Sequence, residues 1–214
     1  MKALIFDLDG TLLDTSEGVV ECVRFAAETL GQPVLPREEL LDFIGPPLTA
    51  SFPKHYGFDE KTTLEAIRLF REHYRDGAIF NARPYEGIFD LCEVIRDNGI
   101  SMAVATNKLE PMAQKLLGHF GFDRYCHPIR GADPDGKLKK ADLIRCCLEE
   151  LHILPQEAVL MGDTVFDAEG AAAAGVHFLA VTYGFGFRNR SDAEQYADMG
   201  IVSAPIEAEE FLLQ

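Results

Sequence analysis

Basic residues are scarce in this chain of 214 residues: 20 Lys and Arg stand against 35 Asp and Glu, a net charge of −15 at pH 7. Because such an acidic chain repels nucleic-acid phosphates, we expect no nucleic-acid polymer as a partner. No apolar run reaches the roughly eighteen residues that a membrane span needs, so we expect no membrane association. The first ten residues are too acidic for a signal peptide, and the expected location is cytoplasmic.

Cysteine pairs with metal-binding or redox spacing are also absent. The five cysteines are Cys22, Cys92, Cys126, Cys146 and Cys147, and they form no CxxC motif and no Cys/His zinc pattern. Such an odd, scattered set is typical of small buried apolar residues in a reducing compartment. We therefore expect no zinc site and no disulfide framework.

Short apolar runs that alternate with helical patterns are what the chain does contain. The expected strands are Lys2–Leu8, Ser101–Thr106, Ala158–Met161, His177–Val181 and Gly200–Val202. The expected helices between them are Tyr85–Asn98, Glu110–Phe120, Lys139–Leu151 and Phe166–Ala174. Continuous apolar strands are covered on both faces in parallel sheets, and alternation with helices implies right-handed crossovers. The sequence thus predicts an α/β fold with a doubly wound parallel sheet.

Residues 14–82 interrupt this alternation with helical patterns alone, at Glu17–Leu30, Arg37–Phe43, Leu48–Tyr56 and Lys61–Tyr74. We predict two domains: residues 1–13 and 83–214 form the α/β core, and residues 14–82 form a small inserted helical domain. Because the insert follows the first strand directly, it is well placed to act as a lid over a site at the end of that strand.

Chemically reactive side chains follow the ends of three predicted strands, where ligands bind in open α/β sheets. Asp7-Leu8-Asp9-Gly10-Thr11 ends the first strand, and its carboxylates could attack phosphorus or bind Mg²⁺. A solvated Asp-rich turn is the alternative interpretation. Thr106 and Asn107 end the second strand, where they could donate hydrogen bonds to a ligand or cap the next helix.

Asp163 and Asp167 follow the third strand, and Asp167 also suits the N-terminus of a helix. Four carboxylates in one crevice would need compensating positive charge. A divalent cation together with one lysine of the cluster Lys137-Leu138-Lys139-Lys140 would supply it.

The chain resembles the haloacid dehalogenase (HAD) superfamily over nearly its whole length. It contains counterparts of that superfamily's four motifs in the same order: DLDGT, TN, a lysine before a helix, and GDTVFD. The resemblance implies a Rossmann-like core with a helical cap domain at 14–82, Mg²⁺ as cofactor, and a phospho-aspartyl intermediate. It implies Asp7 as the nucleophile and Asp9 as general acid and base.

Further roles follow from the same resemblance. Thr106 and Lys140 would hold the phosphoryl group, with Asn107 beside them. Asp7, Asp163 and the Asp9 backbone carbonyl would bind Mg²⁺, and Asp167 would orient that shell. Family members often have Lys-Pro where this chain has Lys140-Ala141, and Lys137 is the alternative phosphate-binding lysine.

Within the superfamily, Asp9 argues against dehalogenases and phosphonatases, which resemble this chain but lack that acid. Thr11 and Val19 differ from the β-phosphoglucomutase pattern. A phosphatase acting on a small phosphorylated metabolite, and existing as a monomer or homodimer, is the expected function. The stretch Arg71–Arg75 and the triplet Arg83-Pro84-Tyr85 resemble the phosphoglycolate phosphatase and 5′-nucleotidase-like branches.

The cap would decide among substrates. The turn Gly45–Leu48 occupies the place of a specificity loop, so Gly45 is a candidate substrate-binding residue. Lys54, Arg71 and Arg75 could bind a second anionic group, or they could be ordinary exposed helix charges. A phosphoglycolate phosphatase-like activity, a 5′-nucleotidase-like activity, and a non-catalytic HAD-fold binding or regulatory protein all remain open.

Overall fold

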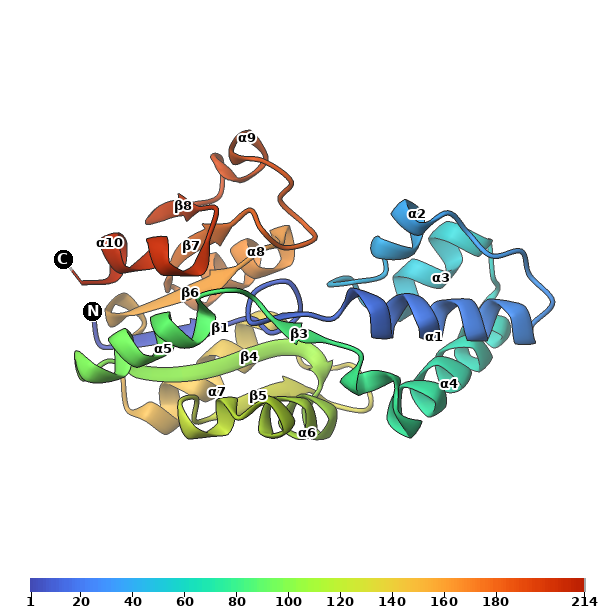
Figure 1. Cartoon of the computed structure of the whole chain (residues 1–214), viewed down its shortest axis with the longest axis horizontal. Coiled ribbons are helices and arrows are strands. Elements are labelled where there is room, and N and C mark those ends of the chain that lie inside the picture. The colour runs from blue at the N-terminus through green and yellow to red at the C-terminus, as the bar shows by residue number, and fades with distance from the viewer. Residues whose placement is uncertain (214) are drawn as a thin grey trace. The chain divides into compact units, whose positions relative to one another are not determined.

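The computed structural model describes residues 1–213, and these divide into two compact units. The first unit comprises Met1–Leu13 together with the part of the chain from Pro84 onward, and the second comprises Asp14–Arg83. Figure 1 shows the first unit built around a sheet and the second built from helices.

The first unit contains a six-stranded sheet with the order β5-β4-β1-β6-β7-β8, and all of its strand pairs are parallel. Its strands are β1 (Ala3–Phe6), β4 (Ser101–Leu109), β5 (Ile129–Ala132), β6 (Ala158–Gly162), β7 (His177–Val181) and β8 (Gly200–Val202). The predicted doubly wound α/β fold is therefore confirmed. The buried patterns of β1 and β6 agree with strands covered on both faces.

Helices link these strands and cover the sheet. They are α5 (Ile88–Asp97), α6 (Glu110–Phe120), α7 (Lys140–Leu151), α8 (Val165–Ala174), α9 (Arg190–Ala193) and α10 (Glu209–Leu212). Short 3₁₀ turns lie at Phe122–Arg124, Pro155–Glu157 and Pro205–Ala208. Helix α5 lies in front of β4 in Figure 1, and α7 lies behind it.

One core cluster lies between the sheet and the helices α7 and α8. Ala3 and Ile5 of β1 face Ile144 of α7 and Ala171 of α8 in this cluster, and all four side chains are fully buried. Leu4 and Phe6 alternate with them and are buried on the opposite face of the sheet. Both faces of the central strand are thus covered, which leaves its carboxyl end as the accessible position for chemistry.

Strand β5 is the strand of the six-stranded sheet that the sequence patterns did not predict. Its sequence, Ile-Arg-Gly-Ala, is short and only partly apolar, and it pairs with β4 at the edge of the sheet. An edge strand is not buried on all sides, so it needs no continuous apolar run. The other five strands of this sheet overlap the predicted segments.

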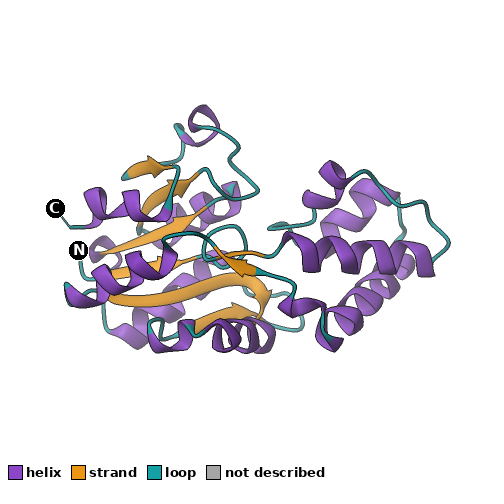
Figure 2. Cartoon of the chain, in the orientation of Figure 1, coloured by secondary structure: helices purple, strands orange, loops and turns teal. Residues whose placement is uncertain are grey.

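The second unit consists of α1 (Ser16–Thr29), α2 (Arg37–Leu41), α3 (Leu48–Tyr56), α4 (Glu60–Asp76) and a 3₁₀ turn at Ala78–Phe80. Its interior is apolar, with α1 packed against α4, and it contains an aromatic cluster of Phe43, Phe52, Tyr56 and Phe58. Figure 2 shows that helices and loops make up nearly all of this unit.

The chain passes between the units twice, at β2 (Leu13–Asp14) and β3 (Arg83–Pro84), which form a two-stranded ribbon. Next to it, Asp14 accepts hydrogen bonds from Ser16 and from Arg83. Among residues 1–213, no helix has the combination of length and apolar character that crossing a membrane would require.

Candidate active site

The turn after β1 separates the two carboxylates of the DLDGT motif. Gly10 adopts a φ of 89°, a left-handed conformation that glycine adopts without strain. The carbonyl of Leu8 accepts hydrogen bonds from the backbone of Thr11, Leu12 and Leu13, which closes the turn. Asp7 is buried at the strand end, whereas the Asp9 carboxylate lies 2.9 Å from the Lys108 ammonium.

Lys140 is the buried cation of the site. Its Nζ lies 2.5 Å from Asp7 Oδ1 and 2.7 Å from Asp167 Oδ1, and it donates to the carbonyl of Ala105 at 2.9 Å. The side chain is only 5% exposed. Lys137, the alternative lysine of the sequence analysis, is 77% exposed and pairs with Asp135. The geometry thus brings Lys140 into the carboxylate cluster.

Asp163 and Asp167 enter the same cluster from the loop after β6 and the start of α8. Thr164 and Asp167 form a reciprocal helix cap, in which the Thr164 hydroxyl donates to Asp167 Oδ2 at 2.6 Å. Asp167 therefore both caps α8 and faces the carboxylate cluster, because Oδ2 accepts the cap hydrogen bond and Oδ1 lies beside Lys140. Thr106 is buried in β4, and its hydroxyl accepts a hydrogen bond from the Lys108 backbone.

Negative charge exceeds positive charge inside this cluster. Burial raises the pKa of Asp7 to about 7, even though Lys140 lowers it, and the charges of Asp167 and Asp9 raise it further. Burial also raises the pKa of Asp163 well above its ordinary value, as do Asp167 and Asp7. Burial lowers the pKa of Lys140, but the carboxylates of Asp167 and Asp7 outweigh burial and hold this pKa above its ordinary value.

The donor set fits a hard divalent cation. Asp7, Asp163 and Asp167 each offer one carboxylate oxygen, and these three oxygens lie within 4.8 Å of one another. Asp163 Oδ1 is buried and has no hydrogen-bond partner in residues 1–213. A buried carboxylate oxygen without a partner is costly, and a bound cation would remove that cost. Because all three candidate ligand atoms are carboxylate oxygens, Mg²⁺ suits the site.

Comparison with known proteins agrees with this geometry. The family model for haloacid dehalogenase-like hydrolases matches residues 4–181. The chain belongs to this family.

Three proteins similar to this HAD chain indicate the kind of enzyme within the family. A 5′-nucleotidase of Pseudomonas aeruginosa is 38% identical over 195 residues, which cover 90% of this chain and 87% of that protein. A phosphoglycolate phosphatase of Aquifex aeolicus is 28% identical, with 86% of each chain covered. The crystal structure of a predicted phosphatase from Clostridium acetobutylicum superposes with a TM-score of 0.91 at 33% identity, covering 100% of this chain and 99% of that one. The HAD chain is a phosphatase related to these enzymes.

Lys108 ends the segment Thr106–Lys108, which the sequence places at the site without a role for the lysine, and its ammonium lies beside Asp9. The loop after β7, Tyr183-Gly184-Phe185-Gly186-Phe187, was missed by the sequence analysis, and its backbone contacts Asp163. Two glycines spaced by one residue directly after a buried strand were the available signal, because such glycines often permit close backbone approach.

Gly45 lies in the second unit of the hydrolase, between α2 and α3, and has a φ of 99°. In the same unit, Lys54 is 68% exposed and its Nζ lies 3.6 Å from Asp42. His73 stacks on Phe25 and pairs with Glu21 at 2.8 Å, in agreement with a packing role for this histidine.

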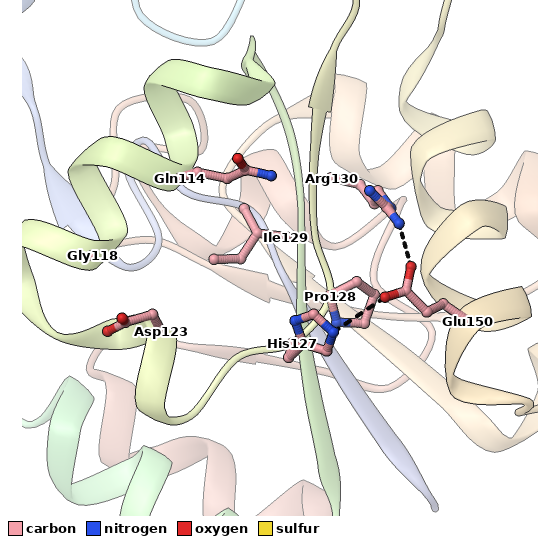
Figure 3. Close-up of a pocket in the computed structure, with 8 residues that line it drawn as sticks. All are labelled: Gln114, Gly118, Asp123, His127, Pro128, Ile129, Arg130 and Glu150. Carbon is pink, nitrogen blue, oxygen red and sulfur yellow. Dashed lines mark hydrogen bonds and ion pairs between the residues drawn. The ribbon is translucent and has the colours of Figure 1, made fainter.

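A pocket in the first unit of the hydrolase lies apart from the carboxylate cluster of the candidate site. This pocket of about 250 Å³ is lined in part by His127, Pro128 and Arg130. Figure 3 shows Arg130 and His127 both directed toward Glu150, with which each forms an ion pair. His127 and Pro128 precede β5, whereas the carboxylate cluster lies where the strands end. Arg130 and His127 of this pocket thus both pair with Glu150.

Proposed function

We propose that this phosphatase is a Mg²⁺-dependent phosphomonoester hydrolase that works through a phospho-aspartyl intermediate on Asp7. The observation that carries the proposal is the placement of Asp7 at the end of β1, bonded to Lys140 and grouped with Asp163 and Asp167. Phosphoryl transfer depends on positioning and charge neutralisation, and this cluster offers both.

In the proposed first step, a carboxylate oxygen of Asp7 attacks phosphorus while the bond from phosphorus to the ester oxygen breaks. Asp9 gives its proton to the leaving alkoxide. In the second step, Asp9 takes a proton from water, the hydroxide attacks phosphorus, and the bond to Asp7 breaks. Lys140, Thr106 and Asn107 hold the phosphoryl oxygens.

Asp7 and Asp163, with the Asp9 carbonyl, would hold Mg²⁺, and Asp167 would orient Lys140 and the metal shell. The ion would shield the phosphate from the Asp7 carboxylate. Residues 14–82 would serve as the cap, with Gly45–Leu48 contacting the part of the substrate beyond the phosphate. Small phosphorylated metabolites in the cytoplasm are the proposed substrates, and the enzyme is proposed to act as a monomer or homodimer.

Phosphoglycolate and nucleoside 5′-monophosphates are the two candidate substrate classes. The higher identity to the 5′-nucleotidase, 38% against 28% for the phosphoglycolate phosphatase, favours the nucleotides. A panel of phosphorylated metabolites that includes both classes decides between them through kcat/KM.

Hydrolysis of p-nitrophenyl phosphate tests the proposal. We expect activity with Mg²⁺, loss of activity after chelation, and recovery when Mg²⁺ is restored. Asp7→Asn should lower kcat by about a thousandfold or more, because the nucleophile is removed. Asp135→Asn, which changes an exposed carboxylate, is the matched control. Activity that survives in Asp7→Asn contradicts the covalent mechanism, and a folded protein without any phosphatase activity favours the binding-protein alternative.

A further inference from the structure

The 183–187 loop (Tyr183–Phe187) wraps its backbone around Asp163. The N–H groups of Phe185 and Gly186 donate to Asp163 Oδ2, at 2.8 and 3.1 Å, and the N–H of Phe187 donates to the Asp163 carbonyl at 2.8 Å. Three consecutive backbone donors thus fix one residue. Since Oδ2 accepts two of these bonds, the carboxylate has a defined rotation, and Oδ1 is the oxygen left without a hydrogen-bond partner among residues 1–213.

Glycine is required in this loop for space. A Cβ on Gly184 would lie 2.4 Å from Asp163 Oδ2 and 2.4 Å from the Gly10 carbonyl. A Cβ on Gly186 would lie 2.4 Å from the Asp163 carbonyl. Neither glycine is among those with positive φ, so other residues could adopt these backbone conformations. Their shared property is therefore close approach to Asp163, which any side chain would prevent.

The loop also holds the turn after β1. The Tyr183 hydroxyl donates to the Thr11 carbonyl at 3.0 Å, and its ring packs on Tyr85. Gly184 lies against the carbonyl of Gly10 in the same turn. One short segment therefore contacts both Asp163 and the turn that carries Asp9, although these lie far apart in the sequence.

We propose that the 183–187 loop is a positioning element for the metal site: it fixes Asp163 so that Oδ1 faces the cation, and it anchors the turn that carries the Asp9 carbonyl. This inference rests on the proposed Mg²⁺-dependent function. Groups that orient metal ligands typically change metal affinity by about ten- to a hundredfold when they are altered.

The test is Mg²⁺ binding by Gly184→Ala, measured by titration calorimetry with Mg²⁺ alone and by the Mg²⁺ concentration that half-saturates hydrolysis. We expect the Mg²⁺ dissociation constant and the half-saturating Mg²⁺ concentration each to rise by about tenfold or more. The KM for p-nitrophenyl phosphate at saturating Mg²⁺ should change little. Gly118→Ala is the matched control, because a Cβ at this helical glycine meets nothing within 4 Å. It should bind Mg²⁺ like the unchanged protein.

Other outcomes separate the ideas. If Gly184→Ala folds with a lowered unfolding midpoint but unchanged Mg²⁺ affinity, the loop is only structural and the inference is overturned. If the unchanged protein neither binds Mg²⁺ nor hydrolyses phosphomonoesters, the proposed function itself fails. Should Gly184→Ala not fold, Tyr183→Phe removes only the hydroxyl bond to Thr11 and is expected to weaken Mg²⁺ binding severalfold; unchanged binding would then refute the anchoring role.

Discussion

The two units of the chain use charged residues in different ways. In the first unit, Asp7, Lys140, Asp163 and Asp167 are buried and contact one another across long sequence distances, such as the 133 residues between Asp7 and Lys140. In the second unit, Arg68 pairs with Glu65 and Glu72 on an exposed face of α4. Buried charges tolerate change poorly because each depends on its partners, whereas exposed ones are screened by water.

The difference suggests a division of roles. Under the proposed function, the reaction would need fixed charges in a water-poor site, and the buried charges of the first unit would supply them. Substrate choice would need a surface that can vary without unfolding the protein, and the small helical unit, with its apolar interior and exposed charges, would supply that surface. Substitutions in the two units should therefore differ in both the size and the kind of their effects.

The largest effect on stability is expected for Lys140→Met. Removing the buried ammonium leaves Asp7 and Asp167 without their shared partner, so we expect the free energy of unfolding at pH 8 without metal to fall by about 3 kcal/mol. The rate of hydrolysis should fall by about a hundredfold or more. Denaturant unfolding and steady-state kinetics measure the two effects.

Lys137→Met is the matched control, because this side chain is 77% exposed and pairs only with exposed Asp135. It should change neither stability nor rate. The opposite result, with loss of activity in Lys137→Met and not in Lys140→Met, would assign phosphate binding to the other lysine and remove the contrast between buried and exposed charge.

A smaller and different effect is expected in the second unit. Pro46→Ala and Leu48→Ala change the turn Gly45–Leu48, and we expect the ratio of kcat/KM between a nucleoside monophosphate and phosphoglycolate to shift by about tenfold. The pH profile of kcat should stay unchanged, because the reacting groups lie in the first unit. Arg68→Ala, on an exposed face of α4, is the control and should leave the ranking alone. An unaltered ranking in both turn variants would show that this turn does not read the substrate.

The smallest effect concerns Asp14 at the boundary of the second unit. Burial raises the pKa of this carboxyl, but hydrogen bonds from Ser16 and the guanidinium of Arg83 outweigh it, and the pKa lies below its ordinary value. A depressed pKa stabilises the folded state above the unfolded pKa of about 3.9, and the contribution is lost as the pH falls through the folded pKa.

The unfolding midpoint of Asp14→Asn should accordingly lie slightly below that of the unchanged protein at pH 6, and the difference should shrink below about pH 4. Thermal unfolding as a function of pH measures it. Arg83→Met should show a smaller difference, because the Ser16 bonds remain. A difference that grows toward low pH would mean that the carboxylate is not stabilised in the folded state.

Much of the fold could be predicted from local patterns. The bounds of α3, α6 and β7 agree with the predicted segments, because apolar periodicity and a following glycine or loop define such elements locally. Strand β5 could not be predicted in this way. Its Arg130 and Gly131 interrupt the apolar run, and the segment is a strand because β4 supplies hydrogen bonds to it.

The candidate site followed the same division. Asp7, Thr106 and Asp163 were predicted from the sequence because each lies at or near the end of a predicted apolar strand, and parallel strands end at the same edge. Lys108 was placed at the site without a role, and the 183–187 loop was not found, since a lysine after Asn107 and two nearby glycines have many ordinary explanations. Their contacts with Asp9 and Asp163 give them significance.

Sequence alone thus determined the class of fold, and it predicted the edge of the sheet where the candidate site lies and the carboxylates of that site. Strand and helix patterns and the residues at strand ends are local properties, so the sequence carries them. Only the folded chain shows the contacts of Lys140 with Asp7 and Asp167, the orientation of the Asp163 carboxylate and the two contacts of the Asp167 side chain. Each depends on atoms that are distant in sequence and meet within about 3 Å, the distance at which hydrogen bonds form.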